Sequence, residues 1–238
     1  MDYLIPLTAR REIAEGTMEF TFDTGNIDYQ FKAGQHTDFT LIDPPYTDAE
    51  GNIRTFSFVN KPGEKKLVIA TRMRDKAFKN SLKEVPFGTK VQIKEPMGRF
   101  TLHNDVSKPA VFLIGGIGIT PVMSILGQWQ TTNEKRDVLL FYANKNQVTT
   151  AYYEELATMA KANPNFHFIL ALTDQVPTDW QGETGRINEA MVRKYLTDPA
   201  QAIFYASGPA VMVSAMVKLA ESLGVPEEQI KTEDFDGY

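Results

Sequence analysis

A glycine-rich stretch from Gly115 to Pro121 contains the residues best suited to hold a charged ligand. It reads Gly-Gly-Ile-Gly-Ile-Thr-Pro and follows an apolar run of strand length, residues 111–114. Apolar residues at 122, 125, 126 and 129 follow at helical spacing. Thr120 is suited to cap this helix, and Pro121 suits its first position, where no backbone N–H is needed. Because the N–H groups at a helix N-terminus bind anions, the stretch indicates a phosphate site.

Two observations leave other interpretations open. A tight strand-to-helix turn needs no ligand, and Pro121 stands where the usual dinucleotide fingerprint has its third glycine. A second stretch, Ser207-Gly208-Pro209, has a similar design, because it follows the apolar run 203–206 and precedes a helical pattern. Two helix N-termini that face one crevice would fit a pyrophosphate or a flat amide ring.

Composition excludes several classes of site. The 238 residues include no cysteine, which rules out disulfides, a cysteine nucleophile and cysteine-held iron–sulfur or zinc sites. The three histidines match no metal-ligand spacing, so no metal is expected. The net charge of −5 argues against nucleic-acid binding. Neither a signal peptide nor a transmembrane stretch is recognisable, so the expected location is the cytoplasm.

The first part of the chain has the pattern of an antiparallel β-barrel. Short runs with strand character are separated by turn signals rich in glycine and proline, which is typical of a sandwich or closed barrel. These runs cover residues 19–22, 37–41, 55–59, 66–70 and 90–93. One helical segment, residues 76–83, interrupts them. We expect this domain to span residues 1–104.

The second part, residues 105–238, alternates apolar strands with helices, which predicts an α/β domain with a parallel sheet. The expected strands cover residues 111–114, 138–142, 166–172 and 203–206. The expected helices cover residues 121–130, 151–161, 188–195 and 210–223. Ligands of such sheets bind at the carboxyl ends of the strands, where both glycine-containing stretches lie.

Four motifs together resemble those of the ferredoxin–NADP reductase-type flavoproteins, in the order found in that family. Arg54-Thr55-Phe56-Ser57 is similar to Arg-x-Tyr-Ser, and 96–100 is similar to the Gly-Pro-x-Gly-x-Phe that ends the barrel. The stretch 115–121 resembles Gly-Gly-x-Gly-x-Thr-Pro, and Ser207-Gly208-Pro209 with Met212 resembles Cys-Gly-Pro-x-x-Met. The resemblance implies a flavin-binding barrel, a nicotinamide-nucleotide-binding α/β domain and hydride transfer between the two cofactors.

For the flavin, the resemblance implies FAD more than FMN. Arg54 would pair with a flavin phosphate, Thr55 and Phe56 would run along the ring system, and Ser57 would bond to the hydride-accepting nitrogen. Phe56 replaces the family's tyrosine and lacks its hydroxyl. The next strand would place Thr71, Arg72 and Met73 at the edge of the ring. The family's second phosphate site corresponds to Lys79, Asn80 and Ser81, with Lys79 in place of a serine.

For the nicotinamide nucleotide, the resemblance implies contacts with Gly115, Gly116, Gly118, Thr120, Pro121, Ser207, Gly208 and Pro209. Ser207 would stand beside the reactive carbon of the nicotinamide, where the family has cysteine. Asn144 and Lys145 follow the second strand of the domain, where coenzyme choice is made, and Lys145 favours NADPH without excluding NADH. The terminal Tyr238 resembles the plant-type tyrosine that covers the flavin and moves aside during turnover.

The leading hypothesis is a stand-alone enzyme that transfers hydride from NAD(P)H to bound FAD and then passes electrons to a separate acceptor. Twelve basic residues lie between Arg54 and Arg99 against four acidic ones, which would suit an acidic ferredoxin or flavodoxin. A solvated sheet face would carry the same charges. The alternatives are an NAD(P)H:flavin reductase that uses free flavin as a substrate, and a non-catalytic nucleotide-binding module.

Overall fold

The structure is a computed structural model that describes residues 2–132 and 134–235 in two compact units. The first, the antiparallel unit, contains the chain up to Thr101 together with Thr120–Thr132. The second, the parallel unit, contains Leu102–Ile119 and the described residues from 134 onward. The sequence assigned the helix after residue 119 to the second half, but this helix is grouped with the first unit. The domain limits 1–104 and 105–238 stay a prediction.

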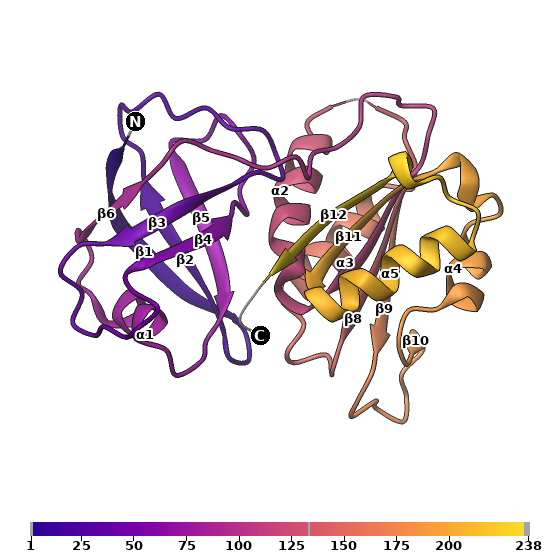
Figure 1. Ribbon diagram of the computed structural model, residues 1–238. Coiled ribbons are helices and arrows are strands. Elements are labelled where there is room, and N and C mark those ends of the chain that lie inside the picture. The colour runs from indigo at the N-terminus through magenta and orange to yellow at the C-terminus, as the bar shows by residue number, and fades with distance from the viewer. Residues whose placement is uncertain (1, 133, 236–238) are drawn as a thin grey trace. The chain divides into compact units, whose positions relative to one another are not determined.

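The antiparallel unit is built on a six-stranded sheet in the order β4-β3-β6-β1-β2-β5 (Figure 1). The strands and the helix of this part are β1 (Tyr3–Ala14), β2 (Thr17–Asp23), β3 (His36–Leu41), β4 (Ile53–Ser57), β5 (Lys66–Arg72), α1 (Ala77–Glu84) and β6 (Lys90–Ile93). The Val59 N–H donates to the Val68 carbonyl (2.8 Å), so the chain beyond β4 runs beside β5 and the sheet curls back on itself. Phe20, Phe22, Phe39 and Phe58 fill the interior.

The parallel unit holds a six-stranded parallel sheet in the order β10-β9-β8-β7-β11-β12. Its strands are β7 (Ala110–Gly115), β8 (Val138–Asn144), β9 (Phe166–Leu172), β10 (Glu183–Thr184), β11 (Ile203–Pro209) and β12 (Ile230–Phe235). Four α-helices follow β7 among the described residues: α2 (Ile119–Trp129), α3 (Tyr153–Ala162), α4 (Glu189–Tyr195) and α5 (Ala210–Ser222). Of these, α2 is grouped with the antiparallel unit from Thr120 onward. The short 3-10 helices are η1 (Gly116–Gly118), η2 (Pro199–Gln201) and η3 (Glu227–Gln229).

Helices cover both faces of the parallel sheet, as the near-continuous apolar strands require. Side chains alternate between faces along each strand. One set, which includes Leu113, Phe141 and Phe204, packs in one cluster with α4 and α5. On the other face, the ring of Tyr153 in α3 lies 6.0 Å from that of Phe168 in β9. The two-domain fold predicted from the sequence is confirmed.

The strand order reverses between β7 and β11. From β7 the chain adds β8, β9 and β10 on one side, and then returns to add β11 and β12 on the other. In open α/β sheets the crevice beyond the carboxyl ends of the strands at such a reversal is where ligands bind. Gly115 ends β7 and Pro209 ends β11, so both glycine-containing stretches lie at this position (Figure 1).

Three strands were not expected from the sequence: β1, β10 and β12. The strand β12 occupies residues of the tail, where it pairs with β11 from Phe204↔Ile230 to Pro209↔Phe235. Within the described residues, no helix has the length and apolar character needed to cross a membrane.

Candidate functional site

Each of the two units contains its own group of candidate site residues. In the parallel unit, Gly115, Gly118 and Gly208 bring β7, η1 and β11 into close contact. A Cβ atom on Gly118 would lie 2.4 Å from the carbonyl oxygen of Ser207, and one on Gly115 would lie 2.1 Å from the sulfur of Met212. Gly208 has a φ of +148°, which residues with side chains rarely adopt. These glycines are therefore required by the packing of the turn.

Replacing Gly118 by alanine should destabilise the parallel unit by about 1–3 kcal/mol, because the added methyl overlaps the backbone of Ser207. Chemical denaturation would measure the free energy of unfolding. Gly127→Ala, within α2, is the matched control. A Cβ atom at this position would lie 3.6 Å from Lys61 Cβ, which is an ordinary van der Waals distance. The control should gain up to about 1 kcal/mol from helix propensity. Equal effects of the two substitutions would contradict the steric explanation.

The prediction that Thr120 caps the helix is wrong. The strand continues through Gly115, Gly116–Gly118 form a 3-10 turn, and α2 begins at Ile119. Thr120 is thus the second residue of the helix and Pro121 the third. Pro121 is still within the first turn, where its missing N–H costs no helical hydrogen bond. The Tyr142 hydroxyl donates to the Gly116 carbonyl (2.9 Å) and holds the turn against β8.

Two buried polar side chains near this turn have no hydrogen-bond partner among the described residues. They are the hydroxyl of Ser207, which is 1% exposed, and both atoms of the Asn144 amide, with Asn144 5% exposed. Ser207 is in register with Ile114 of β7, and Ile114 with Tyr142 of β8. Asn144 follows Tyr142 by two residues and so lies on the same face of the sheet. Buried polar groups normally have partners, so this face is suited to a polar ligand.

Lys145 follows β8 directly, and the N–H of Asp174 donates to its carbonyl (2.9 Å). This contact fixes the backbone at the end of the strand, as does the bond from the Thr173 N–H to the Asn144 carbonyl (2.9 Å). Neither backbone contact uses the Asn144 amide or the Lys145 ammonium. Coenzyme recognition by these two side chains stays a prediction.

In the antiparallel unit, the guanidinium of Arg54 has several partners within the protein. One guanidinium nitrogen donates to the carbonyls of Glu50 (3.0 Å), Gly51 (3.1 Å) and Ile53 (2.6 Å). The other pairs with Glu50 Oε2 at 2.9 Å and with Asp48 Oδ1 at 3.7 Å. The guanidinium also lies over the Phe78 ring, 5.5 Å from its centroid. Arg54 is therefore held by the loop that precedes it in the chain.

The three residues after Arg54 belong to β4, in which successive side chains point to opposite faces of the sheet. The Thr55 hydroxyl donates to Asp38 Oδ1 (2.6 Å), and Ser57 is buried. Phe56 is 8% exposed and packs edge-on to Phe39, with ring centroids 5.7 Å apart. Phe56 thus belongs to the apolar core of the unit. Flavin contacts of Thr55, Phe56 and Ser57 stay predictions.

The second predicted phosphate group lies on α1 and the end of β5. Lys79 Nζ donates to the Arg72 carbonyl (2.9 Å), and burial, with Arg74 and Arg54 nearby, lowers the pKa of Lys79 to about 8. Asn80 Nδ2 donates to Asp75 (2.8 Å). The buried Ser81 hydroxyl donates to the Tyr46 carbonyl and accepts from the Tyr46 N–H, both at 3.1 Å. Lys79 is the member of this group that suits an anion.

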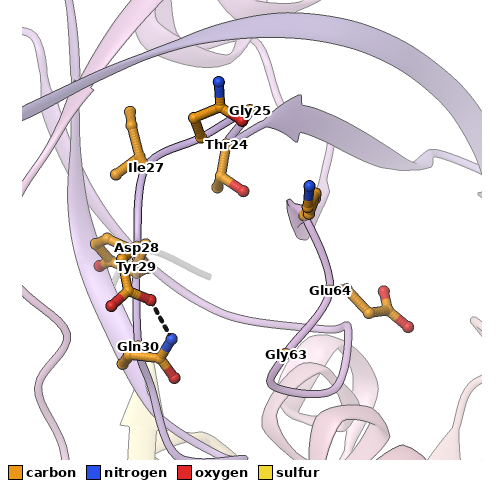
Figure 2. Close-up of a pocket in the computed structure, with 10 residues that line it drawn as sticks. Thr24, Gly25, Ile27, Asp28, Tyr29, Gln30, Gly63 and Glu64 are labelled. Carbon is orange, nitrogen blue, oxygen red and sulfur yellow. Dashed lines mark hydrogen bonds between the residues drawn. The ribbon is translucent and has the colours of Figure 1, made fainter.

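The remaining predicted positions are less informative. Thr71 is buried at the end of β5, its hydroxyl 3.4 Å from the Arg72 carbonyl, and Met73 packs partly against the core. Tyr238 lies outside the described residues. A cavity of about 320 Å³ between segments 24–30 and 63–65 contains none of the predicted site residues (Figure 2). No group of three metal-ligating side chains occurs within residues 2–132 and 134–235.

Sequence reasoning missed Asp48 and Glu50. Glu50 precedes Arg54 by four residues, and its carboxylate joins Arg54 to Lys76 Nζ (2.5 Å). Asp48 Oδ2 accepts the Ala77 N–H in the first turn of α1 (3.2 Å). The acid–x–acid pattern before Arg54 was the available signal, but periodicity does not specify how a loop folds back.

Residues 112–218 match the family described as oxidoreductase NAD-binding domain. A subunit of the Na(+)-translocating NADH-quinone reductase of Klebsiella pneumoniae is 34% identical over 207 residues, which is 79% of this chain and 50% of that protein. The corresponding subunit of Idiomarina loihiensis is 31% identical over 234 residues, 88% of this chain and 56% of that protein. The chain thus spans about half the length of these relatives.

Solved structures share the fold over nearly the whole chain. The Amycolatopsis cytochrome P450 reductase GcoB has a TM-score of 0.86 and 23% identity, covering 99% of this chain and 70% of that one. A ferredoxin NADP+ reductase from Neisseria gonorrhoeae with bound FAD and NADP has a TM-score of 0.82 and 18% identity, covering 98% of both chains. These findings show that residues 112–218 form an oxidoreductase NAD-binding domain and that the chain has the two-domain fold of the ferredoxin–NADP reductase-type flavoproteins.

Proposed function

We propose that the chain takes hydride from NADH or NADPH onto FAD and delivers the electrons to a separate acceptor. The observation that carries this proposal is the pair of unpartnered buried polar side chains, Ser207 and Asn144, beside the glycine turn at the strand reversal. A nicotinamide nucleotide offers an amide and ribose hydroxyls, which such groups can bind. The flavin, when bound, supplies the hydride-accepting ring, and the protein orients the reactants.

The roles of the chain's own residues follow from their positions. Gly115, Gly118 and Gly208 let β7, η1 and β11 pack closely, which fixes the backbone of the turn at the strand reversal. The Ser207 hydroxyl and Pro209 would border the nicotinamide, while Asn144 and Lys145 would bind the adenosine end. In the other unit, Arg54 and Lys79 would bind flavin phosphate, and Ser57 would bond to the ring.

The relatives' name supports NADH as the donor, whereas Lys145 favours the extra phosphate of NADPH. That name also describes one component of a quinone reductase, so stand-alone action is part of the proposal. The basic residues between Arg54 and Arg99 support an acidic ferredoxin or flavodoxin as the acceptor. A cytoplasmic location likewise stays a prediction.

Anaerobic stopped-flow mixing of the FAD-loaded protein with NADH and with NADPH tests the proposal. We expect the flavin absorbance to bleach with at least one coenzyme, and Ser207→Ala to slow bleaching about 5- to 10-fold because one positioning hydrogen bond is lost. Ser222→Ala is the control, since that hydroxyl caps the end of α5 by bonding to the Leu219 carbonyl. Absence of bleaching with both coenzymes would refute hydride transfer and favour a non-catalytic nucleotide-binding module.

A flavin reductase that uses free flavin is the second candidate. The observation that favours it is the ion pair between Arg54 and Glu50, because it engages the predicted phosphate ligand within the protein itself. The two functions differ in how flavin behaves on purification. Protein that is purified without colour and oxidises NAD(P)H only when free flavin is added would support the second candidate.

A further inference from the structure

The loop between β3 and β4, residues 42–52, is held to α1 at several positions. We call it the acidic loop because it carries Asp43, Asp48 and Glu50 and no basic residue. Tyr46 bonds to the Ser81 hydroxyl through its N–H and its carbonyl, and its own hydroxyl donates to Glu84 (2.7 Å). Both contacts hold the centre of the loop beside the helix, within the antiparallel unit.

The two carboxylates near the end of the loop contact three groups that are suited to bind phosphate. Glu50 bridges Arg54 (2.9 Å) and Lys76 (2.5 Å) with its two oxygens. Asp48 accepts the Ala77 N–H (3.2 Å) and lies 3.7 Å from Arg54. Lys76 and then Arg54 hold the pKa of Glu50 below its ordinary value, so the carboxylate is charged at neutral pH.

Carboxylate and phosphate oxygens are recognised by the same donors, namely guanidinium, ammonium and backbone N–H groups. An anionic ligand at Arg54 would meet the Glu50 carboxylate at the same guanidinium. Like charges at one site repel, so ligand and carboxylate exclude each other there. Glu50 and Lys76 are half exposed and Arg54 is 22% exposed, and ion pairs that reach water are weak enough to be exchanged.

We propose that the acidic loop is an internal competitor for the flavin phosphate. In the free protein Glu50 and Asp48 engage Arg54, Lys76 and Ala77, and a phosphate-bearing flavin binds by displacing them. This inference rests on the proposed flavin site at Arg54. It adds that Glu50 and Asp48 lower the affinity of the protein for flavin. The same carboxylates neutralise Arg54 and Lys76 whenever flavin is absent.

Neutral, near-isosteric substitution of the competing carboxylates tests the proposal. Titrating FMN into Glu50→Gln and measuring flavin fluorescence should give a dissociation constant about 5-fold lower than that of the wild type. The double substitution Asp48→Asn with Glu50→Gln should tighten binding further. Riboflavin lacks the phosphate, so its affinity should be unchanged. Glu64→Gln removes one charge from a pair with Lys66 in the same unit and is the matched control.

Inorganic pyrophosphate, titrated calorimetrically into the same proteins, separates this inference from the proposed function. Tighter pyrophosphate binding by Glu50→Gln in a protein that binds no flavin would support the competition and refute the flavin site. FMN affinity that is unchanged or lower in Glu50→Gln, in a wild type that binds FMN, would overturn the competition and leave the flavin site in place. A 5-fold gain shared by riboflavin or by Glu64→Gln would also overturn it, because the effect would not involve phosphate at Arg54.

Discussion

Replacing Arg54 by glutamine should weaken the binding of FMN and FAD by about 30- to 100-fold, with riboflavin affinity changed less than about twofold. Arg54 is the predicted phosphate ligand, and a charge-assisted bond to phosphate contributes about 1.5–3 kcal/mol. Fluorescence titration of each flavin measures the dissociation constants.

Arg11→Gln is the control for Arg54→Gln, because it breaks an ion pair with Glu19 in the same unit (2.8 Å). Its flavin affinity should equal that of the wild type. The double variant Arg54→Gln with Glu50→Gln completes a cycle in which coupled residues give non-additive changes. If Glu50 competes through Arg54, most of the gain from Glu50→Gln should disappear when Arg54 is absent. Wild-type FMN affinity in Arg54→Gln would show that the phosphate binds elsewhere.

The fold was predictable because burial leaves a periodic trace in the sequence. The central strands of the parallel sheet are buried on both faces and so appear as continuous apolar runs, such as residues 138–142. The edge strand β12 was missed because its sequence, Ile-Lys-Thr-Glu-Asp-Phe, has the polarity of a free tail. Its pairing with β11 depends on residues that lie far away in the chain, which no local pattern reports.

The candidate site was predictable where it depends on backbone geometry and not where it depends on loop contacts. Gly118 and Gly208 were identified from the glycine turn and the family motifs, and the structure places both at the strand reversal, where a Cβ atom would meet backbone atoms. The charge count that began at Arg54 omitted Asp48 and Glu50, which neutralise part of the basic segment. The 3-10 turn before α2 was missed for a similar reason, since the capping pattern at Thr120 matches a helix that starts later.

The affinity for FMN should fall about 30-fold between pH 7 and pH 9.5, because Lys79 loses its charge in this range. In the free protein, burial and the positive charges of Arg74, Arg54 and Arg72 lower the pKa of Lys79 to about 8, and Glu50 opposes them. A bound phosphate would raise this pKa toward the ordinary lysine value. Above pH 8 the complex therefore holds one proton more than the free protein, and linkage requires binding to weaken as pH rises. Near pH 7 Lys79 is largely protonated in both forms, so the affinity should change little there.

Fluorescence titrations with FMN across this pH range, in the wild type and in Lys79→Arg, test the assignment. Arginine keeps its charge, so the variant should show no step near pH 8. Riboflavin is the control for ionisation of the flavin ring, since it shares the ring and lacks the phosphate. Lys79→Met should bind FMN weakly at every pH, at about the level that the wild type reaches at high pH. The same step in the wild type and in Lys79→Arg would assign the titration to another group and remove Lys79 from the phosphate site.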